Sequence, residues 1–171
     1  GCFKVGLYKQ GLLHDMSKYS PTEFWVGAKY YQGTRSPNNA EREDIGYSSA
    51  WLHHKGRNKH HYEYWIDYSM QALPGGMAPV PMPDKYIAEM IMDRIAASKV
   101  YMGGEYTDRS PLDYYYQGTD RAPIHPETKA KLLYVLEMLA EEGEEKTFRF
   151  IKEELVQHKR CMDWHQLEKA E

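Results

Sequence analysis

The chain has 171 residues, of which 42% are hydrophobic and 27% charged, and its formal net charge is −3. This length and composition are typical of one soluble globular domain that buries a substantial core. The small net charge gives no overall attraction to nucleic acid or to an anionic membrane surface, so we expect neither as a partner. No apolar run approaches the roughly 18 residues that a membrane-spanning helix requires.

The two cysteines, Cys2 and Cys161, lie near opposite ends of the chain. One bridge between them is possible, but two cysteines cannot form a disulfide framework or a paired-cysteine zinc site. We therefore expect a protein of the reducing cytoplasm. The sequence begins at Gly1 without an initiator methionine, inside a segment whose pattern indicates a helix, and we expect that an upstream helix precedes it.

Residues 3–13 carry an apolar pattern that predicts a partly buried helix, and this helix would end at His14-Asp15. The next helix is expected to begin at Ser20-Pro21, where a capping box coincides with proline at the first helical position. This helix should stop near Gly33. Another is predicted to open at Ser36-Pro37 and to continue without a break to His53-His54.

Residues 62–68 are rich in aromatic side chains and fit either a short helix or an extended strand. Residues 73–83 contain prolines at positions 74, 79, 81 and 83, a density that excludes a helix interior. The pattern here predicts a loop, in which a small hairpin could form.

The second half of the chain is predicted to be helical. The clearest helix spans residues 84–102 and is ended by a Gly-Gly pair. A short helix should begin at Ser110-Pro111, a longer one should run from Pro126 to Gly143, and a last one should begin near Glu145. We therefore predict an all-α fold, a helical bundle with one proline-rich loop, formed as a single domain by residues 1–171.

Histidine and aspartate side chains recur in a pattern that predicts a metal site. Imidazole and carboxylate groups are both ligands of divalent metals, and His14 and Asp15 are adjacent. Four more histidines, at positions 53, 54, 60 and 61, lie close together where a loop has no structural need for them. Asp93 lies within an apolar helix, where a buried carboxylate is costly unless it is paired or binds a metal.

Each of these features also has a simpler explanation. His14-Asp15 could be a helix end with its own hydrogen bonds, Asp93 could pair with Arg94, and an exposed histidine cluster could bind metal only adventitiously. Some of the histidines could orient the ligands instead of binding the ion.

Several polar residues near these histidines are candidates for contacting a substrate. Lys18 follows the His-Asp pair at a spacing that could hold a phosphate, and Arg57 and Lys59 form a basic cluster that could do the same. Asn58 and Glu63 lie in the same stretch and are candidates for polar contacts in the site.

Three segments together resemble the HD superfamily of metal-dependent phosphohydrolases. The His-Asp pair is followed by Met16-Ser17-Lys18, which is similar to the H-D-x-x-K spelling of several branches. Residues 89–97, which contain Asp93, look like the last metal-binding helix of the superfamily. The histidine-rich run from His53 to Trp65 resembles an uncharacterised bacterial branch.

The resemblance implies an HD-like helical bundle that binds one or two divalent transition metals, namely iron, manganese, zinc, cobalt or nickel. The implied ligands are His14, Asp15, His53, His54, His60, His61 and Asp93. The implied reaction is hydrolysis of a small phosphate ester, with a nucleotide as one candidate, by hydroxide that the metal generates from bound water. Asp15 and Lys18 would be catalytic, with Asp15 able to bridge two ions. Substrate contacts would come from Lys18, Arg57, Asn58, Lys59 and Glu63.

One departure from the superfamily bears on these expectations. The superfamily normally takes its first histidine ligand from a helix upstream of the His-Asp pair, and this sequence has no histidine before His14. Either an upstream segment supplies that ligand, or the site is built differently and is one ligand short. Two other functions are compatible with the same residues: a di-iron oxygenase and a non-catalytic helical binding protein.

Overall fold

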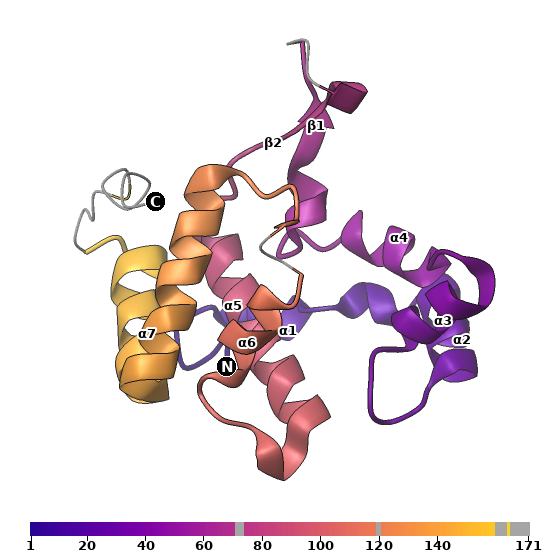
Figure 1. Cartoon of the computed structure of the whole chain (residues 1–171). Coiled ribbons are helices and arrows are strands. Elements are labelled where there is room, and N and C mark those ends of the chain that lie inside the picture. The colour runs from indigo at the N-terminus through magenta and orange to yellow at the C-terminus, as the bar shows by residue number, and fades with distance from the viewer. Residues whose placement is uncertain (71–73, 119–120, 160–163, 165–171) are drawn as a thin grey trace.

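The computed structural model describes residues 1–70, 74–118, 121–159 and 164, so Cys161 lies outside the described residues. The predicted helical fold is confirmed, because helices make up most of the described chain (Figure 1). The α-helices are α1 (Tyr8–Leu13), α2 (Pro21–Tyr30), α3 (Pro37–Ile45), α4 (Ser49–Lys55), α5 (Asp84–Met102), α6 (Ser110–Tyr116) and α7 (Pro126–Phe150). Among the described helices, none is both long enough and apolar enough to cross a membrane.

Shorter elements connect these helices. They are the 3₁₀ helices η1 (Met16–Tyr19), η2 (Tyr62–Trp65), η3 (Pro74–Gly76) and η4 (Gly103–Glu105), the π-helix η6 (Ile151–Val156), and the strands β1 (Ile66–Tyr68) and β2 (Met77–Pro79).

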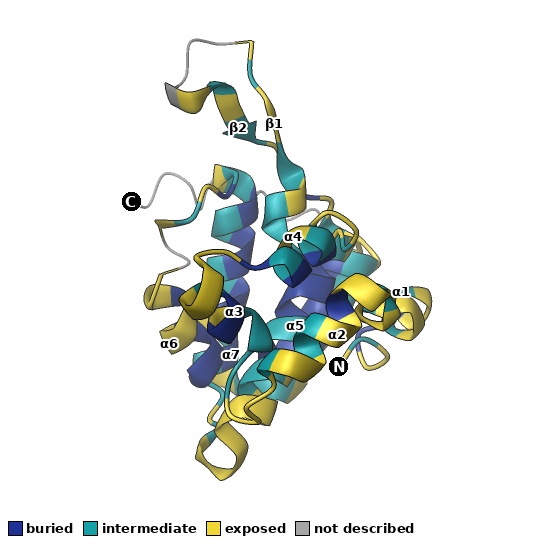
Figure 2. Ribbon diagram, turned by 90° about the vertical axis from the view of Figure 1, so that its right-hand side faces the viewer, coloured by how far each residue is buried: buried dark blue, intermediate teal, exposed yellow. Residues whose placement is uncertain are grey.

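The main hydrophobic core lies between α5, α6, α7 and η6, which together we name the large lobe. Buried residues concentrate in α5 and α7 in Figure 2. Val5 and Leu7, from the turns that precede α1, also pack into this core. Its other fully buried members include Ile87, Ala88, Ile91, Leu132, Val135, Leu136, Leu139, Ile151 and Leu155.

Helices α2, α3 and α4 form a second group, residues 21–55, which we name the small lobe. It lies beside the large lobe in Figure 1, and its helices make their closest backbone contacts with one another and with η1. Its buried apolar side chains are Ala40 and Ala50, whereas Glu23 and Glu41 are buried carboxylates. Its interior is therefore largely polar.

Two predicted helices differ from those in the structure. Residues 1–7 form turns and not the start of a helix, because Gly6 adopts a positive φ of 87°. The predicted continuous helix from Pro37 to His54 is also wrong. Gly46 ends α3 with a left-handed φ of 85°, and Ser48 then caps α4 by accepting a hydrogen bond from the Trp51 N–H.

The proline-rich loop is confirmed and contains a small hairpin. Residues 62–68 adopt both of the conformations considered, first the 3₁₀ helix η2 and then strand β1. Strand β1 pairs antiparallel with β2, with Ile66 opposite Pro79. The hairpin projects away from both lobes in Figure 1.

The predicted helix over residues 84–102 matches α5, and α7 is interrupted at Gly143, where the sequence predicted the end of a helix. Gly143 adopts φ 79° and ψ 173°, which is not a helical conformation, so α7 consists of two helical segments separated at this residue, as predicted. The Thr147 hydroxyl donates a hydrogen bond to the Gly143 carbonyl across the kink.

We predict that Gly143→Ala destabilises the protein. Side chains other than glycine hardly ever adopt this conformation, and a Cβ atom would lie 3.3 Å from Asp108 Oδ2. The expected loss is about 1–3 kcal/mol in the free energy of unfolding, measured by urea denaturation. Gly27→Ala in α2 is the matched control. Its Cβ would meet nothing within 4 Å, and we expect a gain of up to about 1 kcal/mol. Equal effects of the two changes would contradict this account.

Candidate metal centre

The His-Asp pair lies at a sharp turn between α1 and η1. His14 leaves the helix with an extended ψ of 127°, and Asp15 follows in the left-handed region with φ 57° and ψ 21°. Non-glycine residues rarely adopt this conformation, although aspartate does so more often than most. The turn directs the Asp15 side chain towards His54 of α4 and the His14 side chain towards Asp93 of α5.

Six of the seven predicted ligands come together in two overlapping groups. The first contains His14, Asp15, His60 and Asp93, and the second contains Asp15, His54, His60 and His61. Within each group, one ligand atom from each residue lies within 4.8 Å of the others. Asp15 and His60 belong to both groups. These side chains could hold a metal ion.

The ligand atoms converge on the Asp15 carboxylate. Its Oδ1 atom lies 3.2 Å from His54 Nε2 and 3.4 Å from His60 Nε2. His54 and His60 are buried, so the histidine cluster is not an exposed surface feature. Asp93 Oδ1 lies 3.2 Å from His14 Nε2, and these two side chains remain 30% and 24% exposed. The centre is therefore shielded from solvent at His54 and His60 and accessible to solvent at His14 and Asp93.

Two buried atoms at the centre support a metal ion as the missing partner. Within the described part of the chain, neither Asp15 Oδ1 nor His60 Nε2 makes a hydrogen bond of acceptable geometry. Buried polar atoms are rarely left in this state, because their desolvation is not repaid. A cation between a carboxylate oxygen and an imidazole nitrogen would satisfy both, so the residues present fit a metal.

Glu89 of α5 holds two of the histidines in place. Its Oε1 atom lies 3.1 Å from His14 Nδ1 and 3.3 Å from His60 Nδ1, and Gln10 donates a 2.8 Å hydrogen bond to its Oε2. When Nδ1–H faces a carboxylate, the neutral ring offers its Nε2 lone pair to a metal. Glu89 therefore orients the Nε2 atoms of both rings towards Asp15.

Glu23 of α2 holds two other histidines, His53 and His54, in place. His53 Nδ1 and His54 Nδ1 lie 2.6 Å and 2.7 Å from its two carboxylate oxygens. His54 then directs Nε2 towards Asp15 and His61. His53 belongs to neither group of donors, so the structure does not bring this predicted ligand to the centre.

The charges around His14 and Asp15 shift their pKa values in opposite directions. Burial favours neutral His14, but hydrogen bonds to Asp93 and Glu89 outweigh it and raise the pKa of the ring to about 10. Burial also opposes ionisation of Asp15, yet its interactions with His54 and Lys18 hold its pKa well below the usual range. Asp15 is therefore a carboxylate at neutral pH.

His61 can bind a metal as a neutral ligand. Burial, together with the neighbouring His60 and His54, lowers the pKa of its ring to about 3. An uncharged imidazole is the form that binds metal, so His61 needs no deprotonation at neutral pH. Trp51 packs edge-on against this ring and stacks on His54, which closes this side of the centre.

Two of the predicted substrate residues lie at the centre. Lys18 Nζ is 2.5 Å from Asp15 Oδ2, and its side chain remains 63% exposed. Asn58 donates hydrogen bonds to Ser17 Oγ and to the His54 carbonyl, at 2.7 Å and 2.9 Å. Asn58 therefore helps to position the helix end that carries His54.

The other three have different partners. Arg57 donates a hydrogen bond to the His53 carbonyl, and Lys59 lies over the rings of Tyr64 and Tyr86. Glu63 interacts electrostatically with Tyr62 and Arg94. Among the described residues, neither group of possible ligands includes any of these three.

Glu89 and Glu23 orient the histidines but were not among the predicted site residues. Glu89 lies four residues before Asp93, which places both carboxylates on one face of α5, and this spacing was a usable signal. In the sequence, Glu23 only completes the capping box that begins at Ser20. The Ser20 hydroxyl does accept a hydrogen bond from the Glu23 N–H, but the Glu23 carboxylate turns instead to the histidines.

The first group of possible metal ligands, which contains His14, Asp15, His60 and Asp93, has four members without any histidine from upstream of His14.

A family model describes the chain over residues 1–138, which include every member of both groups. The chain belongs to the family of unknown function DUF5662. A search of curated proteins and a search of solved structures each found no match. The function of this DUF5662 protein must therefore be argued from the centre itself.

We predict that the neighbours His53 and His54 differ sharply in their effect on metal binding. His54→Gln removes an Nε2 donor from the second group, and Zn²⁺ affinity should fall by at least about 10- to 100-fold, the range for loss of even a supporting group. His53→Gln is the matched control, since it leaves every donor in place and should cost less. Competition with a chromophoric chelator measures both, and equal losses would contradict the assignment.

We also predict that metal binding releases protons. With a pKa of about 10, the His14 ring is an imidazolium at pH 7 and must lose a proton to bind a metal. Zn²⁺ affinity should therefore rise with pH, by about tenfold per unit for each proton released. The raised pKa stabilises the metal-free fold fully below pH 6.5, and this contribution is lost as the pH rises through about 10. Calorimetry in two buffers of different protonation enthalpy counts the protons, and a heat independent of the buffer would contradict the prediction.

Proposed function

We propose that this protein is a metal-dependent phosphohydrolase acting on a small phosphate ester, with a nucleotide as one candidate. The observation that carries the proposal is the buried pair Asp15 Oδ1 and His60 Nε2, which lack hydrogen-bond partners among the described residues and are surrounded by further ligand atoms. The resemblance of the His-Asp segment and the Asp93 helix to HD phosphohydrolases supports the reaction class.

The nitrogen and oxygen donors suit iron, manganese, zinc, cobalt or nickel better than calcium or magnesium. His14, Asp15, His60 and Asp93 would hold one ion, and His54 and His61 could hold a second together with Asp15. A bound ion would lower the pKa of a water molecule and polarise the phosphoryl group.

Lys18 is the residue best placed to position the phosphate. Its ammonium group contacts Asp15 while its side chain reaches solvent, and the neighbouring His14 and Asp93 are also partly exposed. A phosphate entering from this open side would meet a cation before it meets the buried histidines. Lys18 could turn from Asp15 to the phosphate and form a charge-assisted hydrogen bond.

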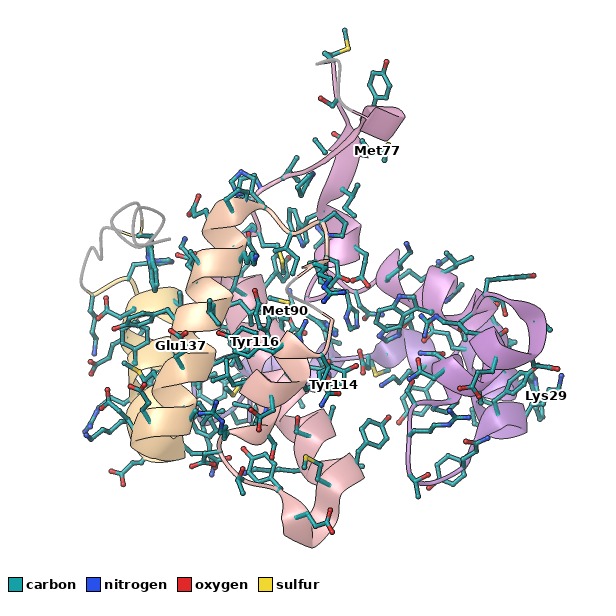
Figure 3. All side chains as sticks on the ribbon, in the orientation of Figure 1. Lys29, Met77, Met90, Tyr114, Tyr116 and Glu137 are labelled. Atoms are coloured by element: carbon teal, nitrogen blue, oxygen red, sulfur yellow. The ribbon has the colours of Figure 1, made fainter. Side chains whose placement is uncertain are left out.

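The proposal predicts that Lys18→Met lowers kcat/KM for phosphate ester hydrolysis by about 10- to 100-fold, because a hydrogen bond to a charged group contributes roughly 1.5–3 kcal/mol. The assay uses p-nitrophenyl phosphate and the nucleoside monophosphates, with metal-free protein to which Mn²⁺, Zn²⁺ or Fe²⁺ is returned. Lys29→Met is the matched control. Lys29 lies at the outer end of the small lobe, away from the centre (Figure 3), and its ammonium group contacts Tyr30 and Asp44.

Two results would overturn the proposed function. Absence of turnover of every phosphate ester by protein with a full complement of metal would refute hydrolysis. Oxygen consumption that depends on iron, with a matching change in the absorption spectrum, would favour a di-iron oxygenase on the same ligands. Equal activity of Lys18→Met and Lys29→Met would refute only the proposed role of Lys18 and would leave the proposed function standing.

A further inference from the structure

The two lobes differ in what holds them together. The apolar core cluster contains residues of the large lobe together with Val5, Leu7, Met82 and Ile124, and among the described residues it contains none from positions 8–81. The small lobe contributes only Ala40 and Ala50 to the buried apolar side chains of the described chain. Burial of apolar surface therefore stabilises the large lobe far more than the small one.

Three of the larger apolar side chains of the small lobe face solvent. Phe24, Trp25 and Leu52 are 52%, 68% and 54% exposed. Its interior is occupied instead by carboxylates and their partners. Glu41 accepts 2.6 Å hydrogen bonds from the hydroxyls of Ser48 and Ser49, and Glu23 binds His53 and His54. These hydrogen bonds replace bonds to water, and the cost of burying the carboxylates that accept them offsets much of their contribution to stability.

The metal centre lies where the two lobes meet. His54 comes from α4 of the small lobe, and Asp93 comes from α5 of the large lobe. Asp15, His60 and His61 come from the segments that connect the lobes, before α2 and after α4. One carboxylate, Asp15, lies within 3.2 Å of His54, and His14 beside it lies within 3.2 Å of Asp93.

We infer that the bound metal has a structural role beyond the proposed chemistry: it fastens the small lobe to the large lobe. His54 of the small lobe and Asp93 of the large lobe belong to different groups of ligands, but the two groups share Asp15 and His60. Ions bound in both groups are therefore connected through these shared residues to both lobes. They stabilise only the arrangement in which the lobes are docked, so their binding free energy becomes docking free energy. Without the ion, the centre brings carboxylates and imidazoles together with two unsatisfied buried atoms. This inference rests on the metal centre and not on hydrolytic activity.

Hydrogen exchange measured by mass spectrometry on the full chain tests the inference. The protein is stripped of metal with a chelator, checked by elemental analysis, and compared with and without added Zn²⁺. At Zn²⁺ about 100 times above Kd, backbone amides of α2 and α4 should exchange about 100-fold more slowly than in the metal-free protein. Amides in the cores of α5 and α7 should exchange at similar rates in both samples.

Two variants remove a donor from either side of the junction. Asp93→Asn acts on the large lobe and His54→Gln on the small lobe, and each should reduce the protection that Zn²⁺ gives to α2 and α4. Slow exchange in α5 and α7 shows that a variant remains folded. Asp113→Asn is the control, since this exposed residue of α6 pairs with Arg109 and lies outside both donor groups.

Three results would overturn the inference: equal exchange of α2 and α4 with and without Zn²⁺, protection spread equally over both lobes, or no binding of Zn²⁺ at all. The outcome is separate from that of the activity assay. Protein that hydrolyses no phosphate ester but gains protection in α2 and α4 would refute the proposed function and support the structural role.

Discussion

The structure of the centre depends on the burial of one carboxylate, that of Asp15, at the junction of two groups of helices. Burying a charge is costly unless other groups compensate for it. Here His54, His60 and Lys18 lie within 3.4 Å of the carboxylate. The left-handed backbone at Asp15 makes this placement possible, since it turns the chain between α1 and η1.

Two further carboxylates convert this cluster into an ordered set of donors. Glu89 and Glu23 each face the Nδ1 atoms of two histidines, and three of these four rings thereby direct Nε2 towards the centre. The fourth ring, that of His53, shares Glu23 with His54 but contributes no donor. Neighbouring histidines thus have different roles, because His54 also reaches Asp15 through Nε2 whereas His53 belongs to neither group of ligands.

Much of the helical fold could be predicted from local patterns. Ser20-Pro21 marks the start of α2, and α5 spans the residues that its apolar periodicity indicated. The predictions failed where a glycine took a positive φ, at Gly6 and Gly46, because a glycine inside a helical pattern does not reveal its own conformation. At Gly143 the prediction is confirmed, because this glycine takes a non-helical conformation that separates two helical segments.

The sequence alone determined that histidines and aspartates capable of binding a metal occur in this chain, because residue type decides which atoms can be ligands. It also determined most of the helices that carry them. Only the tertiary structure decided which side chains meet, since residues 14 and 93 come together only through the packing of α5 beside the turn at Asp15. The same packing brought Glu23 and Glu89 to the histidines, whereas the side chains of Arg57 and Lys59 have other partners. Whether a given histidine can be a metal ligand depends on where its side chain points in the folded protein, and the order of residues in the sequence does not contain that information.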